Sequence, residues 1–360
     1  TAMLGKAALA AAVSLGVLVA SGATVGSGRL VRWLETTIAG VTTTTLSSSK
    51  TSRATATPTP TVTPTPAGSS GGATGSPAMS LGVNVVGPEY FVGSRPFMNL
   101  NAASRGMLVS TSDVWSDIPI DRLNGNHDVV RLQPGEKIAR ILGLPTAAFR
   151  GKSVDIVCRW QGKGDVWMFG TPVKNSRATS NTSLQFTWVP NGRESPSLMY
   201  GNIDAANPIR NIDCREKDAD PDALFDPTFL AGVKQYKTIR YLKWMPGAEA
   251  NSEVTWATRT KPGDGLIFGY DSIPVEYMVE LANQTKTNPW FTLSWNADAD
   301  YVRRFATYVR DNLDPSLVAY VENSNEVWNW GYPVTHQLLR EAKAAGLYPA
   351  DDNIARWYRN

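Results

Sequence analysis

Cysteine and net charge are both scarce in this 360-residue sequence, and each shortage excludes a class of protein. Two cysteines provide no metal-ligand spacing, so we expect neither a metal nor a cofactor. The first 80 residues hold five of the 35 basic and one of the 32 acidic side chains, which leaves 30 basic and 31 acidic side chains in residues 81–360. A nucleic-acid-binding domain concentrates positive charge, so nucleic acid is excluded as a partner. No glycine-rich phosphate loop follows any expected strand, and nucleotide binding is therefore unsupported.

The N-terminal segment, residues 1–40, has the composition of a signal peptide or a membrane anchor. No charged residue lies between Lys6 and Arg29. Lys6 supplies the positive region of a signal peptide, and the small residues 20–23 suit a signal peptidase. The same run is long enough to cross a hydrocarbon core of about 30 Å. Both alternatives predict export to the cell surface or beyond, with possible membrane or cell-wall association; a buried alanine-rich helix is the third alternative.

Residues 41–80 are rich in Thr, Pro, Ser and Gly and predict a disordered linker. They contain no acidic and no aromatic residue, and they have little apolar surface to offset the entropy of the chain. Alternating Thr and Pro at 57–66 favours an extended polyproline conformation. Such a spacer separates a folded module from a membrane, a wall or another domain.

Cys158 and Cys214 both lie in strand-like sequence. Export would permit a disulfide between them. A disulfide would stabilise the fold by about 4 kcal/mol on the chain-entropy model. Two buried free thiols are an equal alternative.

Residues 121–215 contain short strand-like runs separated by turn signals. We expect hairpin turns at 162–164 and 191–192. Several short strands at this spacing predict an inserted β-sandwich or jelly-roll-like domain. The expected strands are 154–158, 166–169, 184–188 and 209–214.

Helices and strands alternate in residues 216–360. The segment 81–120 is expected to supply a first strand, at 81–86, and a first helix. Asp226 followed by Pro227 is typical of a helix N-terminus. Repeated units of this kind predict a parallel sheet, in a barrel or a doubly wound fold. The later expected strands are 238–244, 289–295 and 317–322, and the expected helices are 274–286, 299–313 and 335–345.

The residues that carry chemistry follow the strand expected at 317–322. Ligands of parallel α/β sheets bind beyond the carboxyl ends of the strands, which is where Asn325 and Glu326 stand. A carboxyl group next to Trp328 and Trp330 would be partly desolvated and suited to proton donation. An amide can hydrogen-bond a sugar hydroxyl, and indole faces suit the apolar faces of sugar rings. A surface turn with a solvated Glu and two core Trp residues is the structural alternative.

The same segment resembles a known family signature. The sequence Ser-Asn-Glu-Val-Trp-Asn at 324–329 is similar to the Asn-Glu motif that ends the fourth barrel strand of clan A retaining glycoside hydrolases. These are (β/α)8 enzymes that include cellulases and related β-glycanases, and the likeness extends to exported, cellulase-like bacterial proteins of the clan. The other matching segments are 81–84, 207–212, 239–245, 255–259, 274–283, 289–291 and 300–305.

The resemblance implies a fold and individual roles. The fold would be α/β, the N-terminal half of a TIM barrel with the inserted β domain. Glu326 would be the general acid/base, and Asn325 would bind the sugar 2-hydroxyl. Arg240 would lie near the nucleophile, although a bridge between helix and strand is an equal alternative. The candidate sugar-binding aromatic residues are Trp290, Trp295, Trp328 and Trp330.

The implied reaction is retaining hydrolysis of a β-linked polysaccharide or oligosaccharide, which needs two carboxyl groups about 5–5.5 Å apart. The clan takes its nucleophile from strand seven. Glu322, four residues before Glu326 on the same expected strand, would lie about 13 Å from it. The residues left for the barrel fall short of the ~250 that it typically needs, so we expect an N-terminal fragment without its nucleophile, inactive by itself. The rival function is a non-catalytic glycan-binding or wall-associated protein, and a purely structural surface protein comes third.

Overall fold

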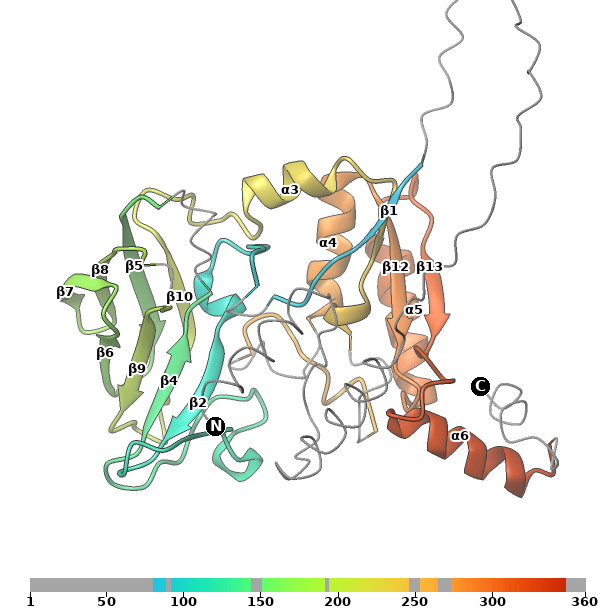
Figure 1. Ribbon diagram of the computed structural model, residues 1–360, viewed down its shortest axis with the longest axis horizontal. Helices are drawn as coiled ribbons and strands as arrows, with labels where there is room; N and C mark the ends of the chain where they lie inside the picture. Colours follow the sequence, from blue (N-terminus) through green and yellow to red (C-terminus); the bar gives the residue numbers. More distant parts are fainter. Residues whose placement is uncertain are drawn as a thin grey trace, which may run out of the picture. The chain divides into compact units, whose positions relative to one another are not determined.

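The computed structural model describes residues 80–88, 92–143, 151–191, 194–245, 253–264 and 273–347. The expected export segment 1–40 and nearly all of the linker 41–80 lie outside the described residues, and so does Gly192 of one expected turn. The described strands form one parallel sheet and two antiparallel sheets (Figure 1). The two kinds of sheet occupy different stretches of the chain.

Four strands form the parallel sheet, in the order β1–β11–β12–β13. They are β1 (Gly82–Asn84), β11 (Thr238–Arg240), β12 (Asn288–Leu293) and β13 (Tyr320–Asn323). Neighbouring strands in this order are paired in parallel. The order is the one that the first four strands of a barrel would have. An eight-stranded barrel stays a prediction, because the described part of the chain contains four parallel strands.

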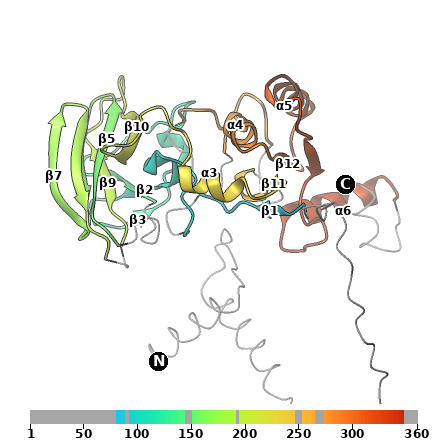
Figure 2. The same cartoon turned by 90° about the horizontal axis from the view of Figure 1, so that it is seen from above.

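Helices α4 (Val275–Thr285) and α5 (Ala299–Asn312) lie on one side of the parallel strands (Figure 2). Tyr301, Phe305 and Val309 of α5 are buried at every fourth position, so one stripe of this helix faces the core. The core that these helices share with the sheet also contains Ile239, Met278, Val279 and Phe291. Among the described residues, no helix combines the length and apolar composition that crossing a membrane would require.

The two remaining described α-helices also begin close to where the sequence predicts them. In α3 (Pro227–Val233), the Asp226 carboxylate accepts hydrogen bonds from the backbone N–H groups of Thr228 and Phe229. This is the expected N-cap with proline at the first helical position. Helix α6 (Pro333–Ala344) likewise starts with a proline.

The strand expected at 238–244 is shorter than the sequence predicts. Strand β11 ends at Arg240, and Leu242–Trp244 forms a 3₁₀ helix. Tyr241 and Trp244 are both fully buried in the same core, and Trp244 Nε1 donates to the carbonyl oxygen of Val86. Residues three apart share a side in a helical turn but not in a strand, so burial of both rings requires the turn.

Two antiparallel sheets form a β-sandwich. One has the strand order β10–β5–β8–β7 and the other the order β3–β2–β4–β9–β6. Side chains from both sheets, such as Phe186 of the first and Ile138 of the second, lie in one buried cluster. The strands of the first sheet are β10 (Arg210–Glu216), β5 (Val154–Gln161), β8 (Ser183–Trp188) and β7 (Val173–Ser180). Those of the second are β3 (Trp115–Ser116), β2 (Arg105–Val109), β4 (Lys137–Ile141), β9 (Ser197–Gly201) and β6 (Asp165–Phe169).

The sandwich begins earlier in the chain than residue 121. Its strand β2 starts at Arg105, and the described residues of 80–120 contain a 3₁₀ helix, Leu100–Ala103, but no α-helix. The first barrel helix expected in this segment is therefore not found there. Leu108 lies in the sandwich core while Val109 lies in a cluster on the other face, which is the alternation of a strand.

Residues 162–164 do not form the expected hairpin. They join β5 to β6, which belong to different sheets. Gly162 has φ +95°, and a Cβ atom there would lie 2.0 Å from the carbonyl oxygen of Pro208. The glycine is thus required by a close approach of two backbones rather than by a hairpin turn.

Cys158 and Cys214 form a disulfide, so the first of the two alternatives for these residues is confirmed. They lie directly opposite each other on β5 and β10, and both are fully buried.

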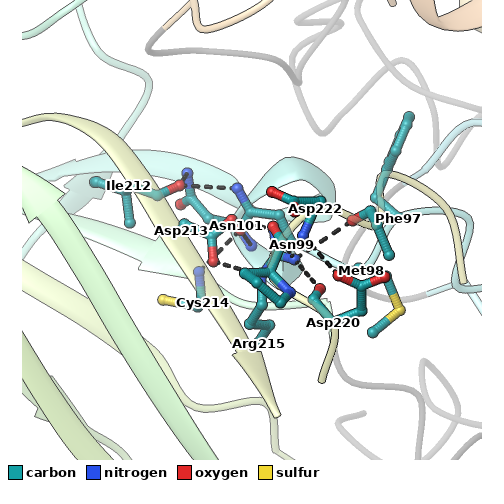
Figure 3. Close-up of polar contacts among 12 residues, drawn as sticks. Phe97, Met98, Asn99, Asn101, Ile212, Asp213, Cys214, Arg215, Asp220 and Asp222 are labelled. Atoms are coloured by element: carbon teal, nitrogen blue, oxygen red, sulfur yellow. Dashed lines mark hydrogen bonds and ion pairs between the residues drawn. The ribbon is translucent and has the colours of Figure 1, made fainter. Parts of the chain in front are cut away.

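Strand β10 is also hydrogen-bonded to the segment before β2 (Figure 3). Asn99 donates from Nδ2 to the carbonyl oxygen of Ile212 at 2.9 Å and accepts at Oδ1 from the Cys214 N–H at 3.0 Å. These bonds fix the start of the sandwich against its last strand.

Candidate functional site

The face of the parallel sheet opposite to Ile239 and Phe291 carries the candidate site. A cavity of about 390 Å³ lies on this face. Successive strands contribute to it because residues that pair across the sheet, such as Arg240, Trp290 and Tyr320, point to the same face. The lining residues are Gly82, Val83, Asn84, Thr238, Arg240, Trp290 and Tyr320.

Arg240 is the centre of a polar network on this face. Its Nε lies 3.0 Å from Glu322 Oε2, and its Nη2 lies 2.8 Å from each oxygen of the same carboxylate. Thr292 Oγ1 donates to Glu322 Oε2 at 3.3 Å. The guanidinium carbon lies 5.2 Å from the centroid of the Trp290 ring. Of the two alternatives for Arg240, a salt bridge is thus observed, but it joins two strands rather than a helix and a strand.

Asn325 is held by the same arginine. Arg240 Nη2 donates to Asn325 Oδ1 at 3.1 Å, which assigns the amide orientation. The amide NH₂ group is then available to donate a hydrogen bond to a ligand oxygen. The structure thereby brings Arg240, Trp290 and Asn325 together, and their roles toward a sugar stay predictions.

Glu326 does not lie on the strand. Strand β13 ends at Asn323, and both Ser324 (φ +62°) and Glu326 (φ +50°) have left-handed backbone conformations. Glu326 is half-buried, and its Oε2 accepts a hydrogen bond from Asn329 Nδ2 at 2.8 Å. Two such residues in three positions are a local strain that structures retain mainly at functional sites. The predicted separation of about 13 Å between Glu322 and Glu326 requires both residues to lie on one continuous strand. That prediction is wrong, because the chain turns between them.

The strand before this turn is less buried than the sequence suggests. Val318, Tyr320 and Val321 are 55%, 46% and 61% exposed. Among the described residues, β13 pairs with β12 alone, so its other edge has no neighbouring strand. The polar side chain of Glu322 and the aromatic ring of Tyr320 alternate with Val321, which places both on the face of Arg240.

The four candidate Trp residues divide into three positions. Trp290 lines the cavity and is 38% exposed, with its ring centroid 6.5 Å from that of Tyr320. Trp328 and Trp330 are 50% and 45% exposed on the turn that follows Glu326. Trp295 packs instead against a small buried cluster of α6 and the preceding turn. Its surroundings are those of a core residue. His336 is exposed and lies beside Trp330, with Nε2 at 2.9 Å from the Trp330 carbonyl oxygen.

Sequence reasoning missed Glu322 and Tyr320 as members of the site. The signal that could have found them is the two-residue alternation along β13, since Tyr320 faces Trp290 and Glu322 faces Thr292 in the register of β12 and β13. Which charged residue lies opposite Arg240 depends on that register, and the register is not written in either strand alone.

No group of three or more His, Cys, Asp or Glu side chains that could hold a metal ion is found in the described ranges. Comparisons with protein-family models, with curated proteins and with solved structures give no match for this chain. The likeness to clan A glycoside hydrolases therefore depends on the motifs of the sequence, and the geometry of the site is an independent observation beside it.

Proposed function

We propose that this chain contributes the general acid/base and part of the substrate cleft of a retaining hydrolase of β-linked glycans, the class its sequence motifs resemble. The observation that carries the proposal is the Arg240–Asn325 hydrogen bond at the end of the sheet. It leaves an amide donor on the residue that precedes Glu326, beyond the end of a strand, where ligands of parallel α/β folds bind.

In the proposed reaction, a carboxylate attacks the anomeric carbon while Glu326 donates its proton to the leaving glycosidic oxygen. A glycosyl ester forms and the C–O bond to the leaving sugar breaks. Glu326, now ionised, then takes a proton from water as the water oxygen attacks the same carbon and releases the ester. No residue of this sequence is assigned as the nucleophile. Glu322 is not proposed as the nucleophile, because Arg240 binds both oxygens of its carboxylate.

The other groups of the site have supporting roles in this proposal. The Asn325 amide donates to the sugar hydroxyl next to the reacting carbon. Trp290, whose ring is partly exposed in the cavity, offers an apolar face to a sugar ring. Arg240 contacts no substrate atom in this proposal, and its role is to position Asn325.

The test is Glu326→Gln in the full reading frame that contains this chain, with release of reducing ends from β-glucan as the measurement. Loss of a general acid/base reduces the rate by about 100-fold or more. Glu280→Gln, at an exposed position on α4, is the matched control and should retain the unaltered rate. Hydrolysis that persists in Glu326→Gln would show that Glu326 is not the acid.

Non-catalytic glycan binding is the second candidate function. It is favoured by one observation: the two carboxylates nearest the turn are engaged, Glu322 by Arg240 and Glu326 by Asn329. If the unmutated protein binds β-glucan oligosaccharides and never releases reducing ends, this second function holds and the hydrolase proposal fails.

A further inference from the structure

The outer face of the five-stranded sheet of the sandwich is a second feature with chemistry, distant in sequence from the site above. Residues directly opposite each other in paired antiparallel strands point to the same face. Val109 lies outside the sandwich core, so its row across the sheet is an outer row. Following the register across the strands, this row contains Trp115, Val109, Lys137, Gly201 and Asp165. The next outer row contains Met107, Ala139, Met199 and Trp167, and the third contains Arg105, Ile141, Ser197 and Phe169.

Aromatic rings form the exposed part of this face. Trp115, Trp167 and Phe169 are 38%, 37% and 57% exposed, although all three are large apolar side chains. The apolar side chains between them, Ala139 and Met199, are buried. Strands β2, β4, β9 and β6 run side by side in Figure 1. Trp115 lies on β3, at one edge of this sheet, and Trp167 and Phe169 lie on β6, at the other edge. We call Trp115, Lys137, Trp167 and Phe169 the aromatic face.

Trp167 lies across the sheet instead of standing away from it. Its Cη2 atom is 3.9 Å from the position that a Cβ atom would occupy on Gly201, in the neighbouring strand and the neighbouring row. Gly201 carries no side chain, so the tip of the indole lies over a position that no side chain fills. Trp167 is 37% exposed, and its ring is therefore accessible to a ligand that stacks on aromatic side chains.

The dimensions of the aromatic face suit an extended ligand. Gly201, beneath the Trp167 ring, is three strands away from Trp115. At the usual strand spacing this separation is roughly 15 Å. Phe169 follows Trp167 by two residues and so lies about 7 Å further along β6. A ligand that covers all three rings must therefore be elongated.

The two basic side chains of the outer rows form ion pairs within the protein, and the acidic one is hydrogen-bonded. Lys137 Nζ contacts Asp113 Oδ1 at 3.2 Å, and Arg105 Nη2 contacts Asp117 Oδ1 at 3.0 Å. Asp165 Oδ2 accepts a hydrogen bond from Asn202 Nδ2 at 2.7 Å. Because both basic side chains of these rows are paired with carboxylates, the face does not attract a polyanion, yet it keeps hydrogen-bonding groups beside the rings. Its complement is an uncharged, elongated, hydroxyl-rich molecule.

We propose that the aromatic face of the sandwich binds an extended, uncharged glycan chain, with the Trp167 indole as the central platform and Trp115 and Phe169 as flanking ones. The choice of a glycan over another elongated neutral polymer rests on the proposed function. The binding itself does not involve Glu326, Asn325 or the cavity of the parallel sheet. In this arrangement the sandwich holds polysaccharide while the parallel sheet provides the cleft.

The experiment is affinity electrophoresis of the full chain in gels that contain hydroxyethylcellulose or neutral xylan. The unmutated chain should be retarded by at least one of these polymers. Trp167→Ala should weaken the retardation by about tenfold, because it removes the central ring, and Trp115→Ala should have a smaller effect. Trp167→Phe, which keeps an aromatic ring, should retain most of the binding. Unchanged thermal unfolding of Trp167→Ala excludes misfolding as the cause.

Two controls separate this site from the cleft. Val302→Ala removes an exposed apolar side chain of α5 and should change nothing. Trp290→Ala removes the ring of the cleft, and adding Trp167→Ala to it should weaken the retardation by the same factor as in the unmutated chain, because the two rings belong to separate sites. If Glu326→Gln shows no effect on hydrolysis but Trp167→Ala still abolishes retardation, the proposed function fails and the aromatic face stands.

Three results would overturn the inference. The first is absence of retardation by either polymer. The second is an equal loss of retardation in Trp167→Ala and Val302→Ala. The third is a dimer, seen by sedimentation velocity, that dissociates in Trp167→Ala and does not respond to polysaccharide, because the aromatic face would then be a contact between two copies of the chain.

Discussion

The sandwich and the parallel sheet bury their strands in different ways. The sandwich packs the inner faces of its two sheets into one core and adds a buried disulfide. The parallel sheet packs one face on α4 and α5, while its other face retains a half-exposed ion pair and two partly exposed aromatic rings. Parallel sheets are normally covered on both faces. The comparison teaches that the polar chemistry of this chain lies where burial is incomplete, and its covalent reinforcement lies where burial is already extensive.

Removal of the disulfide should have the largest effect, and it should be confined to the sandwich. The bond joins residues 56 positions apart, and loss of a loop of that length costs about 4 kcal/mol in the free energy of unfolding. The measurement is hydrogen exchange of the double variant Cys158→Ala with Cys214→Ala. Protection should fall in β5, β8 and β10 and persist in α4 and α5. Equal loss of protection in both regions would show that they unfold as one unit.

Arg240→Ala should have the next largest effect, in the parallel sheet. It leaves the Glu322 carboxylate without its cation in a half-buried position and releases Asn325, so we expect a loss of about 2 kcal/mol. Urea unfolding measures it. Arg310→Ala is the matched control, because Arg310 pairs with Asp311 at an exposed position where such pairs contribute little. An equally small effect of both variants would contradict the structural role of Arg240.

Alkaline pH should have the smallest effect on the free energy of unfolding, and this effect should come from residues of both regions. Burial raises the pKa of Tyr200 in the sandwich and of Tyr301 in α5 to about 12. An unfolded tyrosine ionises near pH 10, so the stability that these residues contribute is complete below pH 10 and is lost as the pH rises toward 12. Each tyrosine should account for about 1 kcal/mol at pH 11.

Unfolding curves of Tyr200→Phe and Tyr301→Phe at pH 8 and pH 11 check this expectation. Each variant should lose less stability between the two pH values than the unmutated chain. Val302→Ala, which removes an exposed apolar side chain and no titratable group, is the control and should leave the pH dependence unaltered. Identical pH dependence in all three variants would show that other groups dominate the alkaline transition.

The local elements were predictable because their signals are local. Asp226 and Pro227 define the start of α3, and the spacing of Tyr301, Phe305 and Val309 gives one apolar stripe on α5. The lengths of strands were less predictable. Trp244 belongs to a strand by composition, yet its burial beside Tyr241 requires a helical turn. Competition between local preference and burial decides such cases, and burial is a property of the whole core.

The candidate site was predictable in its residue types and incompletely in its partners. Asn325 and Glu326 follow a strand of a recognisable kind, and Arg240 and Trp290 lie on neighbouring strands, so the sequence alone indicates a shared edge. The sequence does not show that Glu322 meets Arg240, that Trp295 packs in a core, or that the chain turns at Ser324. Each of these depends on strand register or on backbone conformations that residue type only weakly restricts.

By itself, the sequence determined the alternation of strands and helices, the β-rich stretch and the two cysteines, since periodicity and composition act over a few residues at a time. Tertiary structure decided which charges pair, which Trp rings remain exposed, and which cysteine alternative holds. The physical reason is that pairing, exposure and cross-linking are set by distances between residues far apart in the chain. Those distances exist only after the sheets have packed.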